Sequence, residues 1–518
     1  MTTGEGEREG GLLYDFYRAE LWKRRIDSMD DAIDSAFKLF DSVISTIDGL
    51  SAETMEQLIQ AAGAGDYAHL EEKMSRLAGS LSTRASQERI DPDFEAKQLL
   101  NLYTLCFTIY NFFWTALKAE MWRAVAESAE AGTPPPIHQL RAAFQQVAND
   151  VEIVQRALVQ RRRERDSAGN QNVSLTGRAL FIADKLAFMA LAPAQPLLPA
   201  RVNPIAFLSR ETHLHHVPYH DNFVLIGIKY DHLPPAINQR AYGDQRLDEL
   251  PPLPTFELMA IAHEVGHYVY HQAWIEGERI ATWSAQQFDH PWREEIFADC
   301  YGCLIGGPLL ALSLQALLAY SDDNAACAND GDHPTALLRP FILSEILRTL
   351  AALQPDRYPF AGVARQLNEN WAMTLQRHGH RVAGAASDGQ CIVQAHSGEE
   401  YEVGPALAPL RPMIHAYAER LLAHLSPDAW DEAAAPKRPP RLPWTDAHPA
   451  DLHDYDRVMA AMTGFELAFA PIPNHALVGY GGVNQAGLQQ YIDQWRDSGP
   501  LTIGGHKRPL SDGEGRAL

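Results

Sequence analysis

The chain has 518 residues, of which 46% are hydrophobic and 21% charged, a composition typical of globular proteins with about two to four domains at this length. Its formal net charge of −22 argues against a protein that binds nucleic acid or an anionic membrane surface. Five scattered cysteines, an odd number, favour a reducing compartment such as the cytoplasm over a disulfide scaffold.

Residues 1–11 are polar and contain no apolar segment of the kind that signal peptides carry, so we expect a disordered N-terminus. Over residues 12–170, apolar side chains recur at intervals of three and four, which predicts helices that bury one face. Two long helices are expected, over residues 93–131 and 137–165. We interpret residues 12–170 as a helical bundle domain without chemical groups of its own, a platform for a protein partner or a substrate.

Three consecutive arginines, Arg161, Arg162 and Arg163, are expected to end the second long helix, because cations suit a helix C-terminus. Nucleic-acid binding is the alternative for a basic run, but this run is short and the whole chain is acidic. A polar linker is expected over residues 169–172, followed by an apolar helix over residues 175–191.

An apolar run over residues 223–228 predicts a β-strand. Four histidines precede it, and they invite either a second metal site or the interpretation as exposed loop residues. Loop histidines are the commoner case, and we favour that interpretation. The four are His213, His215, His216 and His220.

The most distinctive chemistry lies in His263-Glu264-Val265-Gly266-His267, an H-E-x-x-H pattern within an apolar helical stretch. On a helix, His263 and His267 lie one turn apart on one face, so two neutral imidazoles can bind a single Zn²⁺. Glu264 lies beside the first ligand, where it can serve as general base toward a metal-bound water. Thr255, after a proline-rich segment, is the expected N-cap of this helix. The alternative is a core helix with two incidental histidines.

A second motif, E-x-x-x-D, begins at Glu295, which lies 28 positions after His267. A catalytic zinc site needs three protein ligands and one open position, and Glu295 is the natural third ligand. Asp299 lies one turn further along the same helix face. From there it can accept the second ring N–H of a ligand histidine and fix the tautomer of that ring.

Together the two motifs resemble those of the gluzincin metallopeptidases, the thermolysin-like group that includes soluble relatives of CAAX prenyl proteases. The resemblance covers residues 223–339, well under half of the chain. It implies a zincin-like catalytic core, which we expect over residues 171–350. The site that it implies has three zinc ligands, a general base and a carboxylate behind the ligands: His263, His267 and Glu295, then Glu264, then Asp299.

The resemblance also implies two features outside the motifs. One is a donor for the tetrahedral oxyanion, usually a His or Tyr downstream of the third ligand; His333 is the candidate and Arg339 the second choice. The structural alternative is a turn in which both residues only support the next helix. The other feature is a strand at the edge of the cleft that pairs with the substrate backbone, for which residues 223–228 are the candidate.

Other residues near the motifs invite a metal role that their positions disfavour. His271 extends the histidine series by another turn, too far along the axis to share one metal with His263. Glu294 precedes Glu295 but points off its face. Cys300 and Cys303 form a lone C-x-x-C, better interpreted as two small side chains in a buried helix.

The most apolar run, over residues 304–320, is interrupted by Gly, Pro, Ser and Gln, and it predicts a buried core helix rather than a membrane span. Residues 351–498 are expected to be mainly helical, with one hairpin formed by residues 390–395 and 400–403. Residues 499–518 are rich in Gly, Pro and charge and predict a disordered tail.

The expected fold is mainly α (α+β), a zincin-like core with a small edge-strand sheet flanked by N- and C-terminal helical regions. The expected function is zinc-dependent hydrolysis of a protein or peptide through a metal-activated water, with one catalytic Zn²⁺ per chain. We expect no nucleic-acid partner and no stable membrane insertion. Two alternatives stay open: a zinc-containing binding or regulatory module without turnover, which the presence of Glu264 argues against, and a zinc hydrolase of a non-peptide amide.

Overall fold

The structure is a computed structural model that describes residues 6–44, 92–131, 137–165, 171–229, 258–319, 331–395 and 398–425, with short gaps in some of these ranges. In this part of the chain most residues are helical and the sheets have only two or three strands, so the expected mainly α fold is confirmed. The chain divides into two compact units. Unit 1 comprises Met1–Gly177, His215–Leu225 and Asn474–Leu518, and unit 2 comprises Arg178–Leu214 and Ile226–Pro473.

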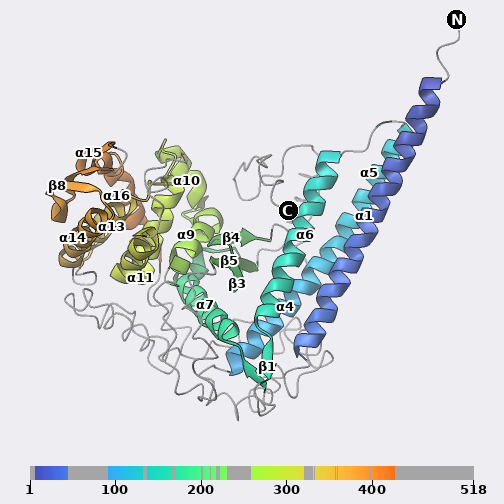
Figure 1. Cartoon of the computed structure of the whole chain (residues 1–518), viewed down its shortest axis with the longest axis horizontal. Coiled ribbons are helices and arrows are strands. Elements are labelled where there is room, and N and C mark those ends of the chain that lie inside the picture. The colour runs from blue at the N-terminus through green and yellow to red at the C-terminus, as the bar shows by residue number, and fades with distance from the viewer. Residues whose placement is uncertain are drawn as a thin grey trace, which may run out of the picture. The chain divides into compact units, whose positions relative to one another are not determined.

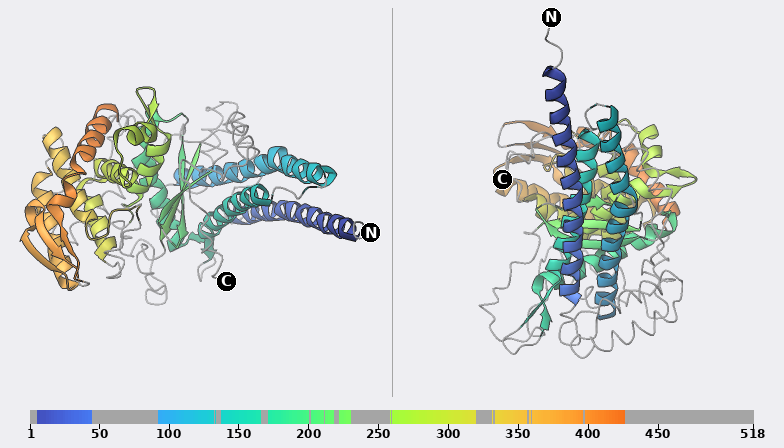
Figure 2. Two further views of the ribbon diagram at one scale, coloured as in Figure 1. Left: turned by 90° about the horizontal axis from the view of Figure 1, so that it is seen from above. Right: turned by 90° about the vertical axis from the view of Figure 1, so that its right-hand side faces the viewer.

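The helices of unit 1 run along one another (Figure 1 and Figure 2). Aromatic side chains are buried between them. Phe40, Phe112 and Phe113 are buried, and the rings of Phe40 and Tyr103 lie 4.7 Å apart. Burial of Phe112 and Phe113 fits the prediction that these helices bury one apolar face, whereas Trp114 in the same stretch is 43% exposed. The helices are α1 (Gly6–Ile44), α4 (Pro92–Asn111), α5 (Lys118–Ala131) and α6 (Ile137–Gln160).

Two helices of unit 1 differ from the prediction. α1 begins at Gly6, so residues 6–11 lie in a helix and not in the expected disordered N-terminus. Glu and Arg are good helix formers, which lets the helix extend through this polar segment. The helix expected over residues 93–131 contains a π-helical segment, η1 (Phe112–Leu117), between α4 and α5.

The end of α6 was also predicted wrongly. The helix stops at Gln160, and the buried guanidinium of Arg161 donates to the carbonyl of Ala157 in its last turn. The chain then forms an antiparallel pair of strands, β1 (Arg163–Arg165) and β2 (Gln171–Val173). The basic run thus crosses from a helix into a hairpin, and part of the expected linker is its second strand.

A three-stranded sheet follows, with β3 (Asn203–Ser209), β4 (His213–His216) and β5 (Phe223–Lys229) in the order β3-β5-β4. The predicted strand over residues 223–228 is confirmed as β5, but it is the central strand. Because β5 is paired on both sides, its interpretation as an edge strand for substrate is wrong. The cause is a non-sequential strand order, which a local apolar pattern does not encode.

The histidines before β5 were expected in a loop, yet three of them belong to strand β4. His220 lies outside the described residues. A half-buried strand is usually recognised by alternating apolar and polar residues. Residues 213–216 are three histidines and one leucine, and all four side chains are partly exposed, so this alternation is absent.

Unit 2 carries both motifs, on α9 (Ile261–Gln272) and α11 (Arg293–Ala319). Two glycines lie where these helices touch. A Cβ at Gly266 would lie 2.8 Å from Ala298 Cα, and one at Gly302 would lie 3.3 Å from His263 Cα. A Cβ at Gly266 would clash and one at Gly302 would be unusually tight, so the two glycines let the motif-bearing faces approach closely. The predicted N-cap, Thr255, lies outside the described residues.

α11 bends at Gly307, whose φ of 53° and ψ of −143° are open mainly to glycine, just before Pro308. The two parts, Arg293–Pro308 and Leu310–Ala319, meet at 110°. Among the helices that the structure describes, none alone is long and apolar enough to cross a membrane; this bent pair passes that test of length and composition only when its parts are combined.

The remaining predictions for unit 2 hold in most places. The apolar helix is α7 (Leu175–Leu191), with the predicted ends, and the predicted hairpin is formed by β9 (Gln390–Gln394) and β10 (Glu400–Glu402). A third strand, β8 (Arg381–Ala385), was missed, because its small, exposed residues show no alternation. The tail over residues 499–518 lies outside the described residues. The other helices are α10 (Ile280–Gln287), α13 (Arg339–Leu353), α14 (Ala361–Arg377), α15 (Val403–Leu407) and α16 (Arg411–His424).

Candidate metal centre

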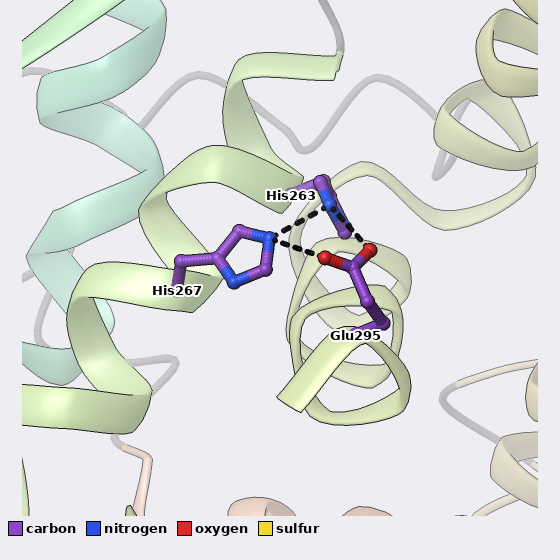
Figure 3. A group of neighbouring side chains, drawn as sticks. All are labelled: His263, His267 and Glu295. Carbon is purple, nitrogen blue, oxygen red and sulfur yellow. Dashed lines mark hydrogen bonds and ion pairs between the residues drawn. The ribbon is translucent and has the colours of Figure 1, made fainter. Parts of the chain in front are cut away.

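Three side chains from two helices converge on one point (Figure 3). His263 and His267 project from α9, and Glu295 projects from the first turn of α11. One donor atom from each lies within 4.8 Å of the other two. His263 and Glu295 are buried, and the His267 side chain is 15% exposed. The fold thus brings together the three residues that their spacing marked as ligands.

The distances between these atoms fit a tetrahedral metal ion. His263 Nε2 lies 3.1 Å from His267 Nε2 and 3.5 Å from Glu295 Oε2, and His267 Nε2 lies 3.3 Å from Glu295 Oε1. Two ligands at zinc bond lengths are about 3.3 Å apart across a tetrahedron. Glu295 Oε2 is buried and accepts no hydrogen bond from the described residues, although Arg339 is near enough for an ion pair. The donor set and its spacing therefore fit Zn²⁺.

Two further carboxylates hold the other nitrogens of the histidine rings. His263 Nδ1 donates to Asp299 Oδ1 at 2.9 Å, and His267 Nδ1 donates to Glu294 Oε1 at 2.9 Å. With both Nδ1 atoms held by carboxylates, the two Nε2 atoms face each other at 3.1 Å, and in two neutral rings both would be acceptors. A proton shared between the rings, an N–H of Arg339, which lies 3.0 Å from His263 Nε2, or a metal ion would stabilise this arrangement.

Arg339, the first residue of α13, lies against this cluster and binds two of its carboxylates. Its Nε and Nη2 donate to Asp299 at 3.1 and 2.9 Å, and Nη2 lies 2.9 Å from Glu295 Oε2. Nη2 also lies 3.0 Å from His263 Nε2. A metal ion on that nitrogen would leave the two bonds to Asp299 to hold the guanidinium. The sequence suggested Arg339 only as an oxyanion donor, because its pairing with Asp299 depends on how α13 docks.

The electrostatics of the cluster favour positive charge at its centre. Burial lowers the pKa of His267, but the charge of Glu295 and the hydrogen bond to Glu294 outweigh burial and raise this pKa to about 9. Burial raises the pKa of Glu295, yet the charges of His267 and Arg339 hold it below its ordinary value. Burial also opposes ionisation of Asp299, but Arg339 and His263 lower its pKa to about 2. Both carboxylates are therefore ionised at neutral pH.

The two predicted catalytic residues lie next to the cluster. Glu264 follows the first histidine on α9 and is 9% exposed, and its charge is among those that raise the pKa of His267. It is not one of the three clustered donors. His333 precedes α13, and its Nε2 lies 3.4 Å from Glu295 Oε1, with 56% of its side chain exposed.

The residues that the sequence argument set aside keep other partners. His271 lies outside the group of three donors, and its Nε2 is 2.9 Å from Glu294 Oε1. Glu294 also lies outside the group of three donors, and its contact with His267 was not predicted; an acid directly before the predicted ligand glutamate was the available signal. Cys300 and Cys303 form no disulfide, and burial raises the pKa of both thiols well above the ordinary value, which fits inert packing residues.

The histidines of β4 do not form a second centre among the residues that the structure describes. His215 Nε2 lies 2.6 Å from Asp150 Oδ1, and Gln146 donates to the same carboxylate oxygen at 2.9 Å. Asp150 is fully buried. This histidine is therefore a partner of a buried carboxylate within unit 1.

Comparison of the chain with protein families, with curated proteins and with solved structures gives no match. The resemblance to gluzincins consequently depends on the two motifs alone, and the function has to be argued from the residues of the cluster.

Proposed function

We propose that this chain is a zinc-dependent peptidase that uses His263, His267 and Glu295 as metal ligands and Glu264 as general base. The observation that supports the proposal most directly is the spacing of three donor atoms within 4.8 Å of one another. Two imidazoles and one carboxylate are the ligand set of catalytic zinc in peptidases such as thermolysin, where a fourth position stays open for water. The same set holds iron(II) in some oxygenases. The buried Glu264 favours hydrolysis, in which a base beside the metal has a direct role.

Zinc in such a site lowers the pKa of water toward about 7 and polarises the carbonyl of the substrate. The residues of the chain supply the other steps. Glu264, as a carboxylate, takes a proton from the attacking water and returns it to the leaving amine. Asp299 holds His263 in the tautomer whose Nε2 faces the cluster. The buried surroundings keep these groups in place with little competition from solvent.

His333 is the candidate for the group that stabilises the oxyanion. Its largely exposed side chain reaches to 3.4 Å of Glu295, so it lies at the border between the cluster and solvent, where a substrate enters. Arg339 is the weaker candidate, because Asp299 and Glu295 already engage its guanidinium.

Two other functions would use the same cluster. A binding or regulatory module would keep zinc without turnover, and a hydrolase of a non-peptide amide would apply the same chemistry to another substrate. The module is the weaker alternative, because structural zinc sites are closed by a fourth protein ligand, whereas the described cluster has three donors.

The decisive experiment compares the full chain with its Glu264→Gln variant after zinc loading. Gln keeps the size and hydrogen-bonding capacity of the side chain but removes the base. We expect the variant to bind one equivalent of zinc, as measured by mass spectrometry of metals, and to cleave a proteome-derived peptide library at least about 100-fold more slowly. Glu369→Gln, an exposed position on α14, is the matched control and should cleave like the unmodified chain.

Each alternative gives a different result. Bound zinc without cleavage by the unmodified chain would favour the module, and bound zinc with cleavage of amides but not of peptides would favour the other hydrolase. Stoichiometric iron in place of zinc would overturn the proposal, as would equal cleavage by the chain and the Glu264→Gln variant.

A further inference from the structure

One carboxylate oxygen next to the cluster is shared by two histidines of α9. Glu294 Oε1 accepts from His267 Nδ1 at 2.9 Å and from His271 Nε2 at 2.9 Å. The side chains of Glu294, His267 and His271 are 17%, 15% and 10% exposed, so water competes weakly for these bonds. The ring of His271 also packs against Tyr270, with the ring centroids 5.1 Å apart.

The consecutive glutamates of α11 serve opposite nitrogens of a single imidazole. Side chains of consecutive helical residues leave the axis about 100° apart, so the two carboxylates cannot easily meet at one metal ion. They do meet on His267: Glu294 Oε1 lies 2.9 Å from Nδ1, and Glu295 Oε1 lies 3.3 Å from Nε2. The first turn of α11 therefore contacts this ring on both of its nitrogen edges.

We infer that Glu294 is a positioning residue for His267 and that His271 acts through Glu294 by holding its carboxylate in place. The inference rests on the proposed function only in taking His267 as a metal ligand. An anionic acceptor on Nδ1–H fixes the tautomer and orientation of a ligand histidine and strengthens Nε2 as a donor. Glu294 does for His267 what Asp299 does for His263. The hydrogen bond from His271 restrains Glu294, just as the hydrogen bonds from Arg339 restrain Asp299.

A purely structural role is the competing explanation, because the same bonds also join α9 to α11. The two roles predict different effects on the unfolding temperature of the metal-free chain and on its dissociation constant for zinc. Loss of a purely structural link should lower the unfolding temperature and leave the zinc dissociation constant unchanged, whereas loss of a positioning residue should raise that constant. Measuring both quantities on the same variants separates the two.

The test uses the full chain, freed of metal by a chelator, and Zn²⁺ as the only ligand, with affinity measured by competition against a chromophoric chelator. Glu294→Ala should raise the zinc dissociation constant about 10–100-fold. Glu294→Gln should recover part of this loss, because the amide oxygen still accepts the Nδ1 proton. Glu369→Ala, at an exposed position of α14, should change nothing.

His271→Leu keeps an apolar side chain against Tyr270 but removes the donor. We expect a smaller loss of zinc affinity, about 3–10-fold, and no additional loss when the substitution is made in the Glu294→Ala variant, since residues that act in series are not additive. If Glu294→Ala does not fold, the Glu294→Gln and His271→Leu variants still decide the question.

Unchanged zinc affinity in all three folded variants would overturn the positioning role and leave the proposed function standing. Additive losses in the double variant would overturn the part assigned to His271. A full chain that binds no zinc at micromolar concentration would overturn both this inference and the proposed function, and it would be recognised before any variant is compared.

Discussion

Unit 1 and the α9–α11 pair of unit 2 both bury a histidine against a carboxylate, but the bonds lead to different outcomes. In unit 1, His215 Nε2 and Gln146 both turn toward Asp150, so the buried carboxylate is met by donors. Between α9 and α11 the carboxylates take the Nδ1 protons, and the two Nε2 atoms are left facing each other at 3.1 Å. The histidine–carboxylate pair of unit 1 is thus a packing contact, whereas the pair between α9 and α11 also brings two imidazole nitrogens and a carboxylate oxygen within 4.8 Å of one another, which a metal ion requires.

Removing a donor from the cluster should have the largest effect. We expect His267→Ala and Glu295→Ala to weaken zinc binding by more than about 100-fold, since the loss of a ligand exceeds the loss of a group behind it. The measurement is the metal content of zinc-loaded, desalted protein. Full retention of zinc by both variants would show that the ligands lie elsewhere and would remove the contrast between the two regions.

Removing the acceptor behind His263 should have the next largest effect. Asp299→Ala leaves all three donors but removes the acceptor of the His263 Nδ1 proton and one of the two carboxylates that bind Arg339, so zinc affinity should fall about 10–100-fold. Competition against a chelator measures the change. Affinity equal to that of the unmodified chain would reduce Asp299 to a structural ion pair.

A methyl group at Gly266 should separate the helices that carry the donors. The added Cβ would meet Ala298 Cα at 2.8 Å, a backbone atom that cannot turn away. We expect Gly266→Ala to lower the free energy of unfolding by about 1–3 kcal/mol, as in other overpacked cores, and to weaken zinc binding as well.

Gly362→Ala is the matched control for this substitution, because a Cβ on that residue of α14 would meet no atom within 4 Å. Its unfolding free energy should be unchanged or slightly higher, since Ala favours helix. Denaturant unfolding compares the two variants, and equal stability of both would mean that α9 and α11 do not need the close approach.

The smallest effect is expected in unit 1. His215→Ala removes one hydrogen bond from the buried Asp150 and should cost about 1–2 kcal/mol of stability. The zinc content should stay at one equivalent per chain, because His215 is not among the clustered donors. A loss of zinc in this variant would mean that the two regions do not act separately.

The parts of the site that were predictable are those that depend on the geometry of one helix. The spacing of His263 and His267 places both on one face of α9, and the spacing of Glu295 and Asp299 does the same on α11. The sequence shows an acid next to the ligand glutamate, but it does not show that this acid faces His267. That contact depends on how α9 and α11 cross.

The same limit explains the errors in the fold. The ends of α7 follow from its own apolar pattern and were predicted correctly. The central place of β5 depends on its pairing with β3 past the intervening β4, a strand order that no local apolar pattern encodes. The end of α6 coincides with the burial of Arg161, whose guanidinium donates to Ala157 four residues back, and an apolar pattern does not reveal that a basic residue is buried.

Glu294 and Glu295 both lie in the first turn of α11, beside the N–H groups that begin the helix. The first N–H groups of a helix have no partner within it and carry a partial positive charge of about half a unit, which stabilises nearby anions by about 0.3–1 kcal/mol each. Two adjacent carboxylates repel each other, and the helix terminus offsets part of this repulsion. The same two residues in the middle of a helix would lack that support. The backbone of α11 thus supports two adjacent carboxylates, one of which accepts from two histidines while the other belongs to the group of three donors.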